Sequence, residues 1–533
     1  MVAFLVAWSA GSAAGESPLA AACAQPAAPQ VAVDAAGDPV AVWLCLRPAM
    51  SVQSSVRPAG AHIWRAPQQI VRVPSGVSVA DLALAVGGAG DAVAVWLRSS
   101  VARDATHALT SVVQAAVRPA GAEAWIRGQD LSAPSANAVA PQVAVDRSGD
   151  AVVVWSSSCE NASEVAECAG TIHEAERPAM TGTWSSPKDI SAPGHSASAP
   201  RVAVDPAGTA VAVWTTDRGF VQAVVRAAST ARWSMPQDLG ATHVTTEPPE
   251  IALDAAGNAI VVYVAGATIE SIVRPSATGM WGRPEDLPSV GQSYPEFLQV
   301  AVAMNAAGEA VAVWRRGSED APPPVVQASV RSLASGRWSV PETLSDASAE
   351  AGLPEVALDA AGNAVAVWQD GVRTSPFICP LKHCTFPAPS VEAAVLSGAS
   401  GIWSAPRRWQ DVGQPQVAVA AGGDALSVWV GVRNHGDVVQ ATDRSAATHA
   451  WTAPERVSAR AAARCAVPPL VGLTLPKAEA ALRRNDCRVG RITYAYSQRV
   501  KRGHVLAQRR TPGTALRGGA PVGVVVSRGR RNR

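Results

Sequence analysis

The sequence lacks any run of about 18 apolar residues, so it predicts no membrane-spanning segment. Charged residues are few, 17% of the chain against 48% hydrophobic residues, and this balance excludes a disordered chain. Lysine is scarce too, so the basic residues are nearly all arginine. With the abundance of alanine, valine, glycine and proline, this bias is typical of a GC-rich bacterial genome.

Recognised catalytic motifs are missing as well. The chain has no GxSxG, HExxH or P-loop sequence, and its nine histidines are scattered. A sialidase needs an arginine cluster, a tyrosine nucleophile and an acid, and Tyr294-Pro-Glu296 is the only loose candidate. The acidic pair Glu319-Asp320 lies in a proline-rich stretch typical of a solvated loop. We therefore predict no enzyme activity, and no catalytic, metal-binding or cofactor-binding residue.

The eight cysteines favour disulfides over a metal site. No CxxC or HxxxH spacing occurs, whereas six cysteines form close pairs along the chain. Disulfides indicate an oxidising compartment, so we expect an extracellular or cell-envelope protein. Cys23 and Cys45 remain, and they could form a further disulfide with each other. The predicted pairs are Cys159 with Cys168, Cys379 with Cys384, and Cys465 with Cys487.

The first 28 residues resemble a leader segment. Val2–Trp8 is a short apolar run, and Ala22-Cys-Ala24 offers a cleavage site, but the positive start of a signal peptide is absent. Leu19-Ala-Ala-Ala-Cys23 is a loose match to a lipobox.

Charge divides the chain into two parts. Residues 464–533 hold 16 basic and two acidic residues, while the remaining 29 basic and 41 acidic residues give the rest a net charge of −12. The basic end predicts contact with something anionic, and a solvated tail is the alternative. No nucleic-acid motif accompanies the charge, so we expect no nucleic-acid partner.

A fifteen-residue pattern recurs eight times, most clearly as PEVALDAAGNAVAVW at Pro354–Trp368. Its period-two apolar alternation predicts two strands, and Asp-x-x-Gly predicts the turn between them. The Asp side chain is expected to accept backbone N–H bonds in the turn, since one carboxylate per turn is too few for calcium. The turn residues in chain order are Asp34, Gly87, Asp146, Asp205, Asp254, Asn305, Asp359 and Ala420.

Each copy is followed by a second hairpin, and an aromatic residue closes each hairpin. A regular tryptophan ladder suggests either a carbohydrate-stacking surface or the core of the repeat, and we favour the core. A regular arginine on the third strand is also predicted to be structural. The aromatic residues are Trp43, Trp96, Trp155, Trp214, Tyr263, Trp314, Trp368 and Trp429 in the first hairpins, and Trp64, Trp125, Trp184, Trp233, Trp281, Trp338, Trp403 and Trp451 in the second.

Four short strands at this period are typical of a β-propeller blade. We predict eight blades over residues 29–457, with the first hairpins inside and the second outside, then a linker at 458–464. A string of β-sandwich domains, each built from two repeats, is the alternative. The insertions Ser156–Gly170 and Gln369–Ser390 carry cysteine pairs and are expected on one face, where binding usually occurs. The Asp-x-x-Gly turn followed by Trp loosely resembles the Asp-box of sialidase-like propellers.

Residues 465–529 closely resemble a PASTA domain, the module associated with penicillin-binding proteins and serine/threonine kinases. Thr474, Pro476 and the residues to Arg484 predict a helix, in a β-α-β-β order. The resemblance implies an extracytoplasmic module, and some members of the family are proposed to bind peptidoglycan. The features that carry it, in family order, are Val467-Pro468, Val471-Gly472, Ala478, Leu482, Ser497, Val500, Gly503, Val505, Gln508, Gly513, Gly518 and Val524-Val-Val-Ser-x-Gly529.

These observations predict a secreted or envelope-associated binding or adhesion protein without catalytic activity. Its PASTA-like module would contact peptidoglycan or another anionic wall polymer, and its propeller would present a face to an unknown protein or carbohydrate ligand. Residues 530–533 form a basic tail. The alternative is a sialidase-like glycoside hydrolase with degenerate Asp-boxes.

Overall fold

The computed structural model describes residues 23–58, 61, 63–101, 109–134, 137–157, 170–241, 247–266, 268–288, 299–317, 324–346, 350–371, 389–431, 437–458, 464–484, 487–517 and 520–530. These residues form two compact units, with the boundary between Ser458 and Arg464. The predicted disulfides Cys159–Cys168 and Cys379–Cys384 lie outside the described residues, as do Tyr294-Pro-Glu296 and Glu319-Asp320.

The described part of the first unit consists of eight antiparallel sheets of four or five strands. The first four sheets are formed by β1 (Pro26–Val33), β2 (Pro39–Cys45), β3 (Ser51–Val56) and β4 (Gln68–Arg72); β5 (Val77–Val86), β6 (Ala92–Val101), β7 (Leu109–Arg118) and β8 (Ile126–Asp130); β9 (Ala138–Val145), β10 (Ala151–Ser157), β11 (Ile172–Arg177) and β12 (Lys188–Asp189); and β13 (Ala197–Val204), β14 (Ala210–Thr216), β15 (Phe220–Ala227), β16 (Arg232–Trp233) and β17 (Gln237–Ala241).

The other four sheets repeat the same order of strands. They are formed by β18 (Glu250–Leu253), β19 (Ala259–Ala265), β20 (Thr268–Arg274) and β21 (Glu285–Asp286); β22 (Val300–Met304), β23 (Ala310–Arg316), β24 (Val325–Arg331) and β25 (Glu342–Thr343); β26 (Ala351–Leu358), β27 (Ala364–Asp370), β28 (Ser390–Ser397), β29 (Ile402–Trp403) and β30 (Arg407–Gln410); and β31 (Val412–Val419), β32 (Ala425–Gly431), β33 (Val438–Arg444) and β34 (Glu455–Arg456).

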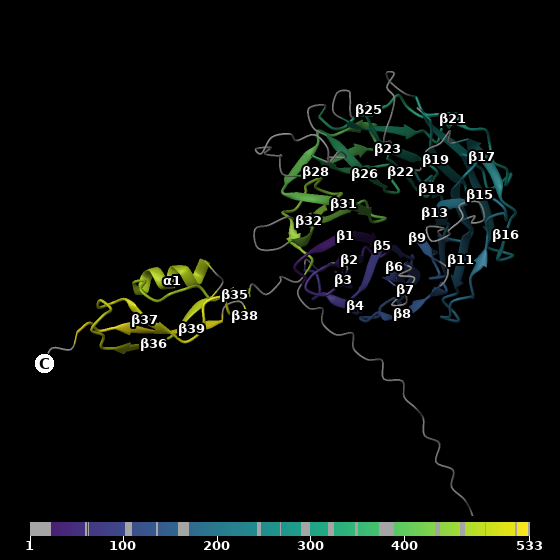
Figure 1. The fold of residues 1–533 in the computed structure, drawn as a ribbon. Coiled ribbons are helices and arrows are strands. Elements are labelled where there is room, and N and C mark those ends of the chain that lie inside the picture. The colour runs from purple at the N-terminus through teal and green to yellow at the C-terminus, as the bar shows by residue number, and fades with distance from the viewer. Residues whose placement is uncertain are drawn as a thin grey trace, which may run out of the picture. The chain divides into compact units, whose positions relative to one another are not determined.

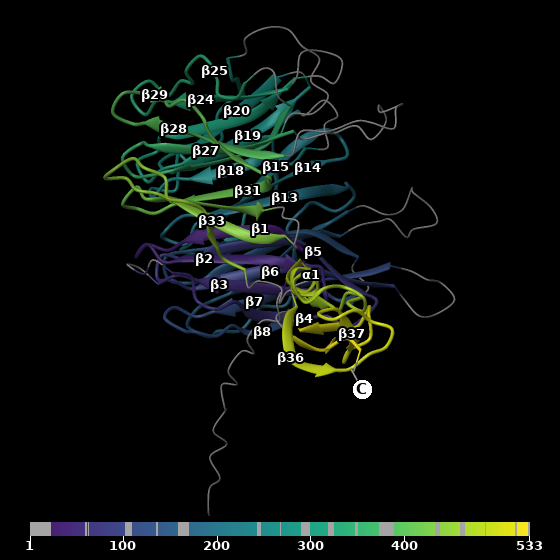
Figure 2. The same ribbon diagram turned by 90° about the vertical axis from the view of Figure 1, so that its left-hand side faces the viewer.

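The sheets are arranged around a common centre, as in a β-propeller (Figure 1). The first strand of each sheet contacts the first strand of the next, and β1 contacts β31 of the last sheet. Figure 2 shows the ring from the side. The first hairpin of each repeat lies inside and the second outside, as predicted. Because each sheet packs on both neighbours, the arrangement differs from a string of separate β-sandwiches.

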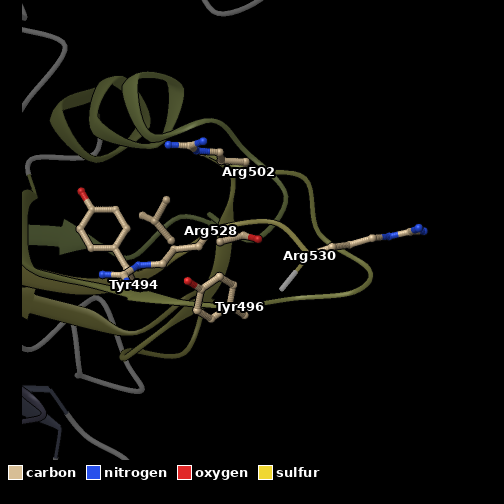
Figure 3. A pocket seen from close by; sticks show the side chains of 8 residues that line it. Tyr494, Tyr496, Arg502, Arg528 and Arg530 are labelled. Atoms are coloured by element: carbon tan, nitrogen blue, oxygen red, sulfur yellow. The ribbon is translucent and has the colours of Figure 1, made fainter. Parts of the chain in front are cut away.

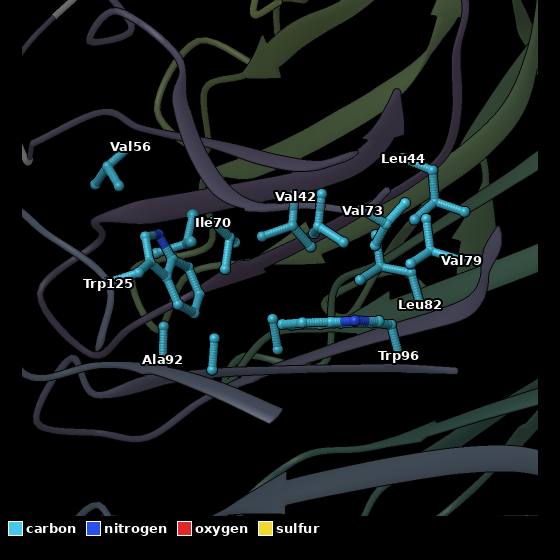
Figure 4. Packing of buried hydrophobic residues seen from close by; sticks show 14 residues of the cluster. Val42, Leu44, Val56, Ile70, Val73, Val79, Leu82, Ala92, Trp96 and Trp125 are labelled. Carbon is cyan, nitrogen blue, oxygen red and sulfur yellow. The ribbon is translucent and has the colours of Figure 1, made fainter. Parts of the chain in front are cut away.

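The core lies between neighbouring sheets, and each second strand contributes to two cores. On β6, Ala92, Ala94 and Trp96 pack on the first sheet (Figure 4), whereas Val93 and Val95 pack on the third. Small alanines allow close approach on one face, and valines fill the space on the other. The aromatic residues that close the first hairpins are all less than 5% exposed, which confirms that they belong to the core. Those that close the second hairpins are buried or half-buried.

The turn aspartates cap their own turns, as predicted. Asp205 Oδ1 accepts hydrogen bonds from the amides of Ala207 and Thr209 at 2.8 and 2.9 Å. The same pair of bonds recurs at the other four turn aspartates and at Asn305. The glycine that follows has positive φ, +92° at Gly208, a conformation that other residues adopt at a cost.

The other carboxylate oxygen faces the turn of the next sheet. Asp146 Oδ2 lies 3.1 Å from the position that a Cβ atom would take on Gly208. Seven of the eight described turn glycines meet a carboxylate of the preceding sheet in this way. The turn acid therefore links neighbouring sheets as well as closing its own hairpin.

The first and last sheets meet through Arg57 and an apolar cluster that includes Trp43 and Val428. The Arg57 guanidinium donates to both carboxylate oxygens of Asp443, at 2.7 and 2.5 Å, and to Glu455 at 3.1 Å. These contacts are partly shielded from water, since the side chains of Arg57 and Asp443 are 14% and 29% exposed.

A disulfide joins Cys23 to Cys45 at the end of β2. The thiol that the lipobox match would require at Cys23 is therefore bonded, and Cys23 and the start of β1 fall within the segment interpreted as a leader. In the second unit, Cys487 is disulfide-bonded and buried. The side chain of its predicted partner, Cys465, is not among those that the structure describes. The pairing of these two cysteines therefore stays a prediction.

The second unit is a small α+β fold with one helix. Its elements are β35 (Arg464–Ala466), α1 (Leu475–Arg484), β36 (Arg488–Ala495), β37 (Val505–Gln508), β38 (Ala515–Arg517) and β39 (Pro521–Ser527). β39 pairs parallel with β36 and antiparallel with β37, and β35 pairs with β38. The helix begins directly after Thr474, as predicted, and buries Ala478 and Leu482. The expected β-α-β-β order is incomplete, because four strands follow the helix. The sequence did not reveal β38, since a strand of three residues is too short to show apolar alternation.

Removal of one turn carboxylate should destabilise the first unit. We expect Asp205→Ala to lower the free energy of unfolding by about 1–3 kcal/mol, since two amides lose their acceptor. Asp205→Asn should cost less, because Asn305 makes the same bonds in the sixth repeat. Urea unfolding followed by tryptophan fluorescence measures both; equal losses would show that the amide bonds contribute nothing.

Candidate functional site

A pocket of about 650 Å³ opens on the second unit (Figure 3). Its wall is formed by the ends of β36 and β39 and by the loop before β37. The labelled side chains come from these three segments, and Gly503, Val526 and Ser527 complete the lining. Those side chains are Tyr494, Tyr496, Arg502, Arg528 and Arg530.

Strand pairing brings the aromatic and basic side chains together. Tyr494 on β36 stands opposite Val526 on β39, and Tyr496 lies two residues further on. The pairing extends beyond the strands, because the Arg528 amide donates to Ala495 O at 2.8 Å and the Ser497 amide donates to Gly529 O at 3.0 Å. Arg528 is thereby held beside both rings, with its guanidinium carbon 5.8 Å from each ring centroid.

The pocket suits an anionic ligand with a flat or cyclic body. Its lining includes three arginines and no acidic residue. Arginine binds carboxylate and phosphate groups through paired N–H donors. Tyr494 and Tyr496 are 56% and 54% exposed, so their rings are open to a ligand. Sequence reasoning found the basic charge of this region but missed the pair Tyr494 and Tyr496 at the end of β36.

A second polar site lies at the centre of the ring. Six inner strands carry a variable residue directly after proline: Gln30, Gln142, Arg201, Glu250, Glu355 and Gln416. Arg201 Nε donates to Glu250 at 2.9 Å, and Gln416 Nε2 donates to Glu355 at 3.0 Å. Glu250 lies on β18 and Glu355 on β26, the first strands of two sheets that are not neighbours, and these first strands surround the centre of the ring (Figure 1).

The two central carboxyl groups have different partners. Burial raises the pKa of Glu355 to about 7, and the negative charge of Glu250 adds to the shift. The hydrogen bond from Gln416 and the charge of Arg201 oppose it. Burial also raises the pKa of Glu250, although its ion pair with Arg201 acts in the other direction. The sequence offered one signal for this cluster, the variation after an otherwise repeated proline.

Tyr263, which closes the first hairpin of the fifth repeat in place of a tryptophan, is buried. Tyr263 is 1% exposed and donates to Glu270 at 2.5 Å, and burial followed by the hydrogen bond to Glu270 raises its pKa. It is therefore a core residue rather than a nucleophile. Among the described residues, no group of three or more His, Cys, Asp or Glu side chains is placed to hold a metal ion. No helix in the same part of the chain is long and apolar enough to cross a membrane.

The raised pKa of Glu355 predicts a dependence of stability on pH. The folded state binds its proton more tightly than the unfolded state, whose pKa is near 4.5, so this contribution weakens as pH rises from about 4.5 through about 7. We expect Glu355→Gln to stabilise the first unit at pH 8 by roughly 1 kcal/mol, allowing for solvent screening, and to change little at pH 4.5. Thermal unfolding at both pH values tests this, and a gain that is the same at both would contradict it.

Comparison with known proteins concerns mainly the second unit. The model of the PASTA domain family matches residues 466–528. No curated protein matches the chain.

Solved structures resemble the first unit only weakly. A protein of unknown function from Dyadobacter fermentans is 12% identical, with 58% of this chain and 96% of that chain covered and a TM-score of 0.38. The NanB sialidase of Streptococcus pneumoniae is 7% identical, with 66% and 67% covered and a TM-score of 0.36. The intramolecular trans-sialidase of Ruminococcus gnavus is 8% identical, with 66% and 92% covered and a TM-score of 0.36. These similarities carry no information on function. The pocket of tyrosines and arginines thus belongs to a PASTA domain, which follows a large β-rich region in this chain.

Proposed function

We propose that this protein is a non-catalytic binding protein of the bacterial cell envelope, outside the cytoplasmic membrane. Its PASTA domain contacts peptidoglycan or another anionic wall polymer. The observation that carries this proposal is the pocket of three arginines and two exposed tyrosines in that domain. The charge of the domain supports it, because 16 basic residues against two acids attract polyanions over a distance that salt limits.

We further propose that the first unit is a closed propeller of eight blades that presents a ligand-binding face. Support comes from the eight sheets of the described residues and from the contacts of β1 with β31. The Cys23–Cys45 disulfide supports an oxidising location for this unit.

Glycoside hydrolysis is a second candidate function, favoured by one observation. Glu250 and Glu355 interact at the centre of the ring, and their different partners give them different environments. Such pairs can divide the roles of acid and base. Release of reducing sugar from wall glycans by the wild-type protein, and its loss in Glu355→Gln, would favour hydrolysis over binding alone.

The wall-binding proposal predicts that Arg528→Ala weakens retention of the full chain on purified peptidoglycan by about tenfold, since one charge-assisted contact is worth 1–3 kcal/mol. Tyr494→Ala should weaken it as well. Arg491→Ala is the matched control, because Arg491 is exposed on β36 but does not line the pocket. Sedimentation at moderate salt measures retention. Equal losses in Arg528→Ala and Arg491→Ala would leave net charge, and not the pocket, as the cause.

The closed ring predicts energetic coupling between residues distant in sequence. A double-mutant cycle of Arg57→Ala and Asp443→Ala should give a coupling free energy of about 1–3 kcal/mol, because the two side chains form a shielded, paired contact. The free energies of unfolding come from urea titration. Additive effects of the two substitutions would contradict closure between the first and eighth sheets.

A further inference from the structure

At the junction between the first and eighth sheets, the turn of the eighth repeat carries Ala420 where five repeats carry aspartate. The backbone of its turn is unchanged: the Ala420 amide donates to Asp424 O at 2.9 Å, and the Gly423 amide donates to Ala420 O at 2.9 Å. Gly423 has φ +86°, like the other turn glycines. The turn is therefore formed as usual, but it lacks the carboxylate that caps five others.

The missing side chain leaves two amides without their usual acceptor. In the third repeat, the amides of Ser148 and Asp150 donate to Asp146 Oδ1 at 2.8 and 2.9 Å. The corresponding amides belong to Gly422 and Asp424, and both residues are exposed. Within the described residues, no side chain accepts a hydrogen bond from either amide. These two N–H groups therefore point to the position that a carboxylate oxygen occupies in the aspartate-capped turns.

The missing side chain also leaves a space against the next sheet. At the other seven turn glycines, a carboxylate oxygen lies 2.6–3.1 Å from the position of an added Cβ. The second and sixth repeats, which lack the turn aspartate, fill this place with Asp91 and Glu309. At Gly37, by contrast, no described atom lies within 4 Å. A pocket of about 500 Å³ opens here, with Gly37 and Ala420 in its lining.

The junction of the third and fourth sheets shows that a carboxylate fits among these charges. There, Arg226 pairs with Glu176 at 2.7 Å, and Asp146 is present in addition. At the junction of the first and eighth sheets, Arg57 and Asp443 take the places of Arg226 and Glu176. Asp424 also matches Asp150, since each accepts an amide from the following hairpin. The junction of the third and fourth sheets thus accommodates a turn carboxylate beside an arginine–acid pair, whereas the junction of the first and eighth sheets adds Glu455, which pairs with Arg57 at 3.1 Å and stands where the third sheet has Lys188.

We propose that the pocket between the first and eighth sheets binds a small organic carboxylate. The carboxylate occupies the place of the absent turn side chain, accepts hydrogen bonds from the amides of Gly422 and Asp424, and lies over Gly37. Val33, Pro39 and Leu426 offer an apolar wall to the rest of the ligand. This site is separate from the PASTA domain, and the proposal is independent of wall binding.

The test uses the full chain and trifluoroacetate as the probe. The fluorine-19 transverse relaxation rate of the probe is measured with wild type, Ala420→Asp, Ala420→Asn and Ala421→Asp at equal ionic strength in chloride buffer. Ala420→Asp places a carboxylate in the pocket, and Ala420→Asn caps the amides without adding charge, as Asn305 does in its own turn. Ala421→Asp adds the same charge at an exposed neighbouring position. The arginines of the PASTA domain bind the probe equally in all four proteins, so the difference between them reports the pocket.

We expect wild type and Ala421→Asp to relax the probe faster than both Ala420 variants, and excess acetate to remove the difference. Circular dichroism is used to check that each variant is folded. If Ala420→Asp does not fold, Ala420→Asn decides the question. Relaxation that is the same in wild type and in the folded Ala420 variants would overturn the proposal, and so would a loss of equal size in Ala421→Asp.

Discussion

The second strand of every described sheet in the first unit is buried on both faces, and the unit depends on that constraint. β6 places valines toward one neighbouring sheet and alanines with Trp96 toward the other. Neither face can be left in water at a reasonable cost in free energy, since burial contributes about 25 cal/mol for each Å² of apolar surface. Both faces of every sheet are covered when the sheets form a ring, because the last sheet then covers the first. The contacts of β1 with β31 meet this need.

The turn acids add a second connection that is polar and directional. One oxygen closes the hairpin of its own sheet, and the other faces the glycine of the next sheet. The glycine is needed for its positive φ and because a Cβ atom would meet the neighbouring carboxylate. Aspartate and glycine therefore depend on each other across the junction, which explains why both recur although they lie in different sheets when they meet.

Much of this arrangement could be predicted from the sequence, because the repeat states it eight times. The strand pairs, the capping role of Asp205 and the burial of Trp96 all follow from period, turn chemistry and position. The central cluster could not be predicted in the same way. Arg201 and Glu250 lie 49 residues apart, and their ion pair requires the curvature of the ring as well as the strand pattern. The pocket of the PASTA domain depends likewise on the parallel register of β36 and β39, which no local pattern specifies.

Repetition also separates packing from function within the chain. A residue that recurs at one position of every repeat, such as the core tryptophan, serves an interaction that each junction needs. A position that varies without disturbing the backbone does not contribute to the packing that each junction requires. The residue after proline changes among glutamine, arginine and glutamate because it lies at the centre of the ring, where Arg201 and Gln416 hydrogen-bond to the equivalent residue of a neighbouring sheet instead of packing in the apolar core. Ala420 likewise keeps its turn while leaving space beside Gly37. Binding chemistry in a propeller of near-identical repeats therefore arises where one copy departs from the rest, because only there do charge or space remain unused by the fold.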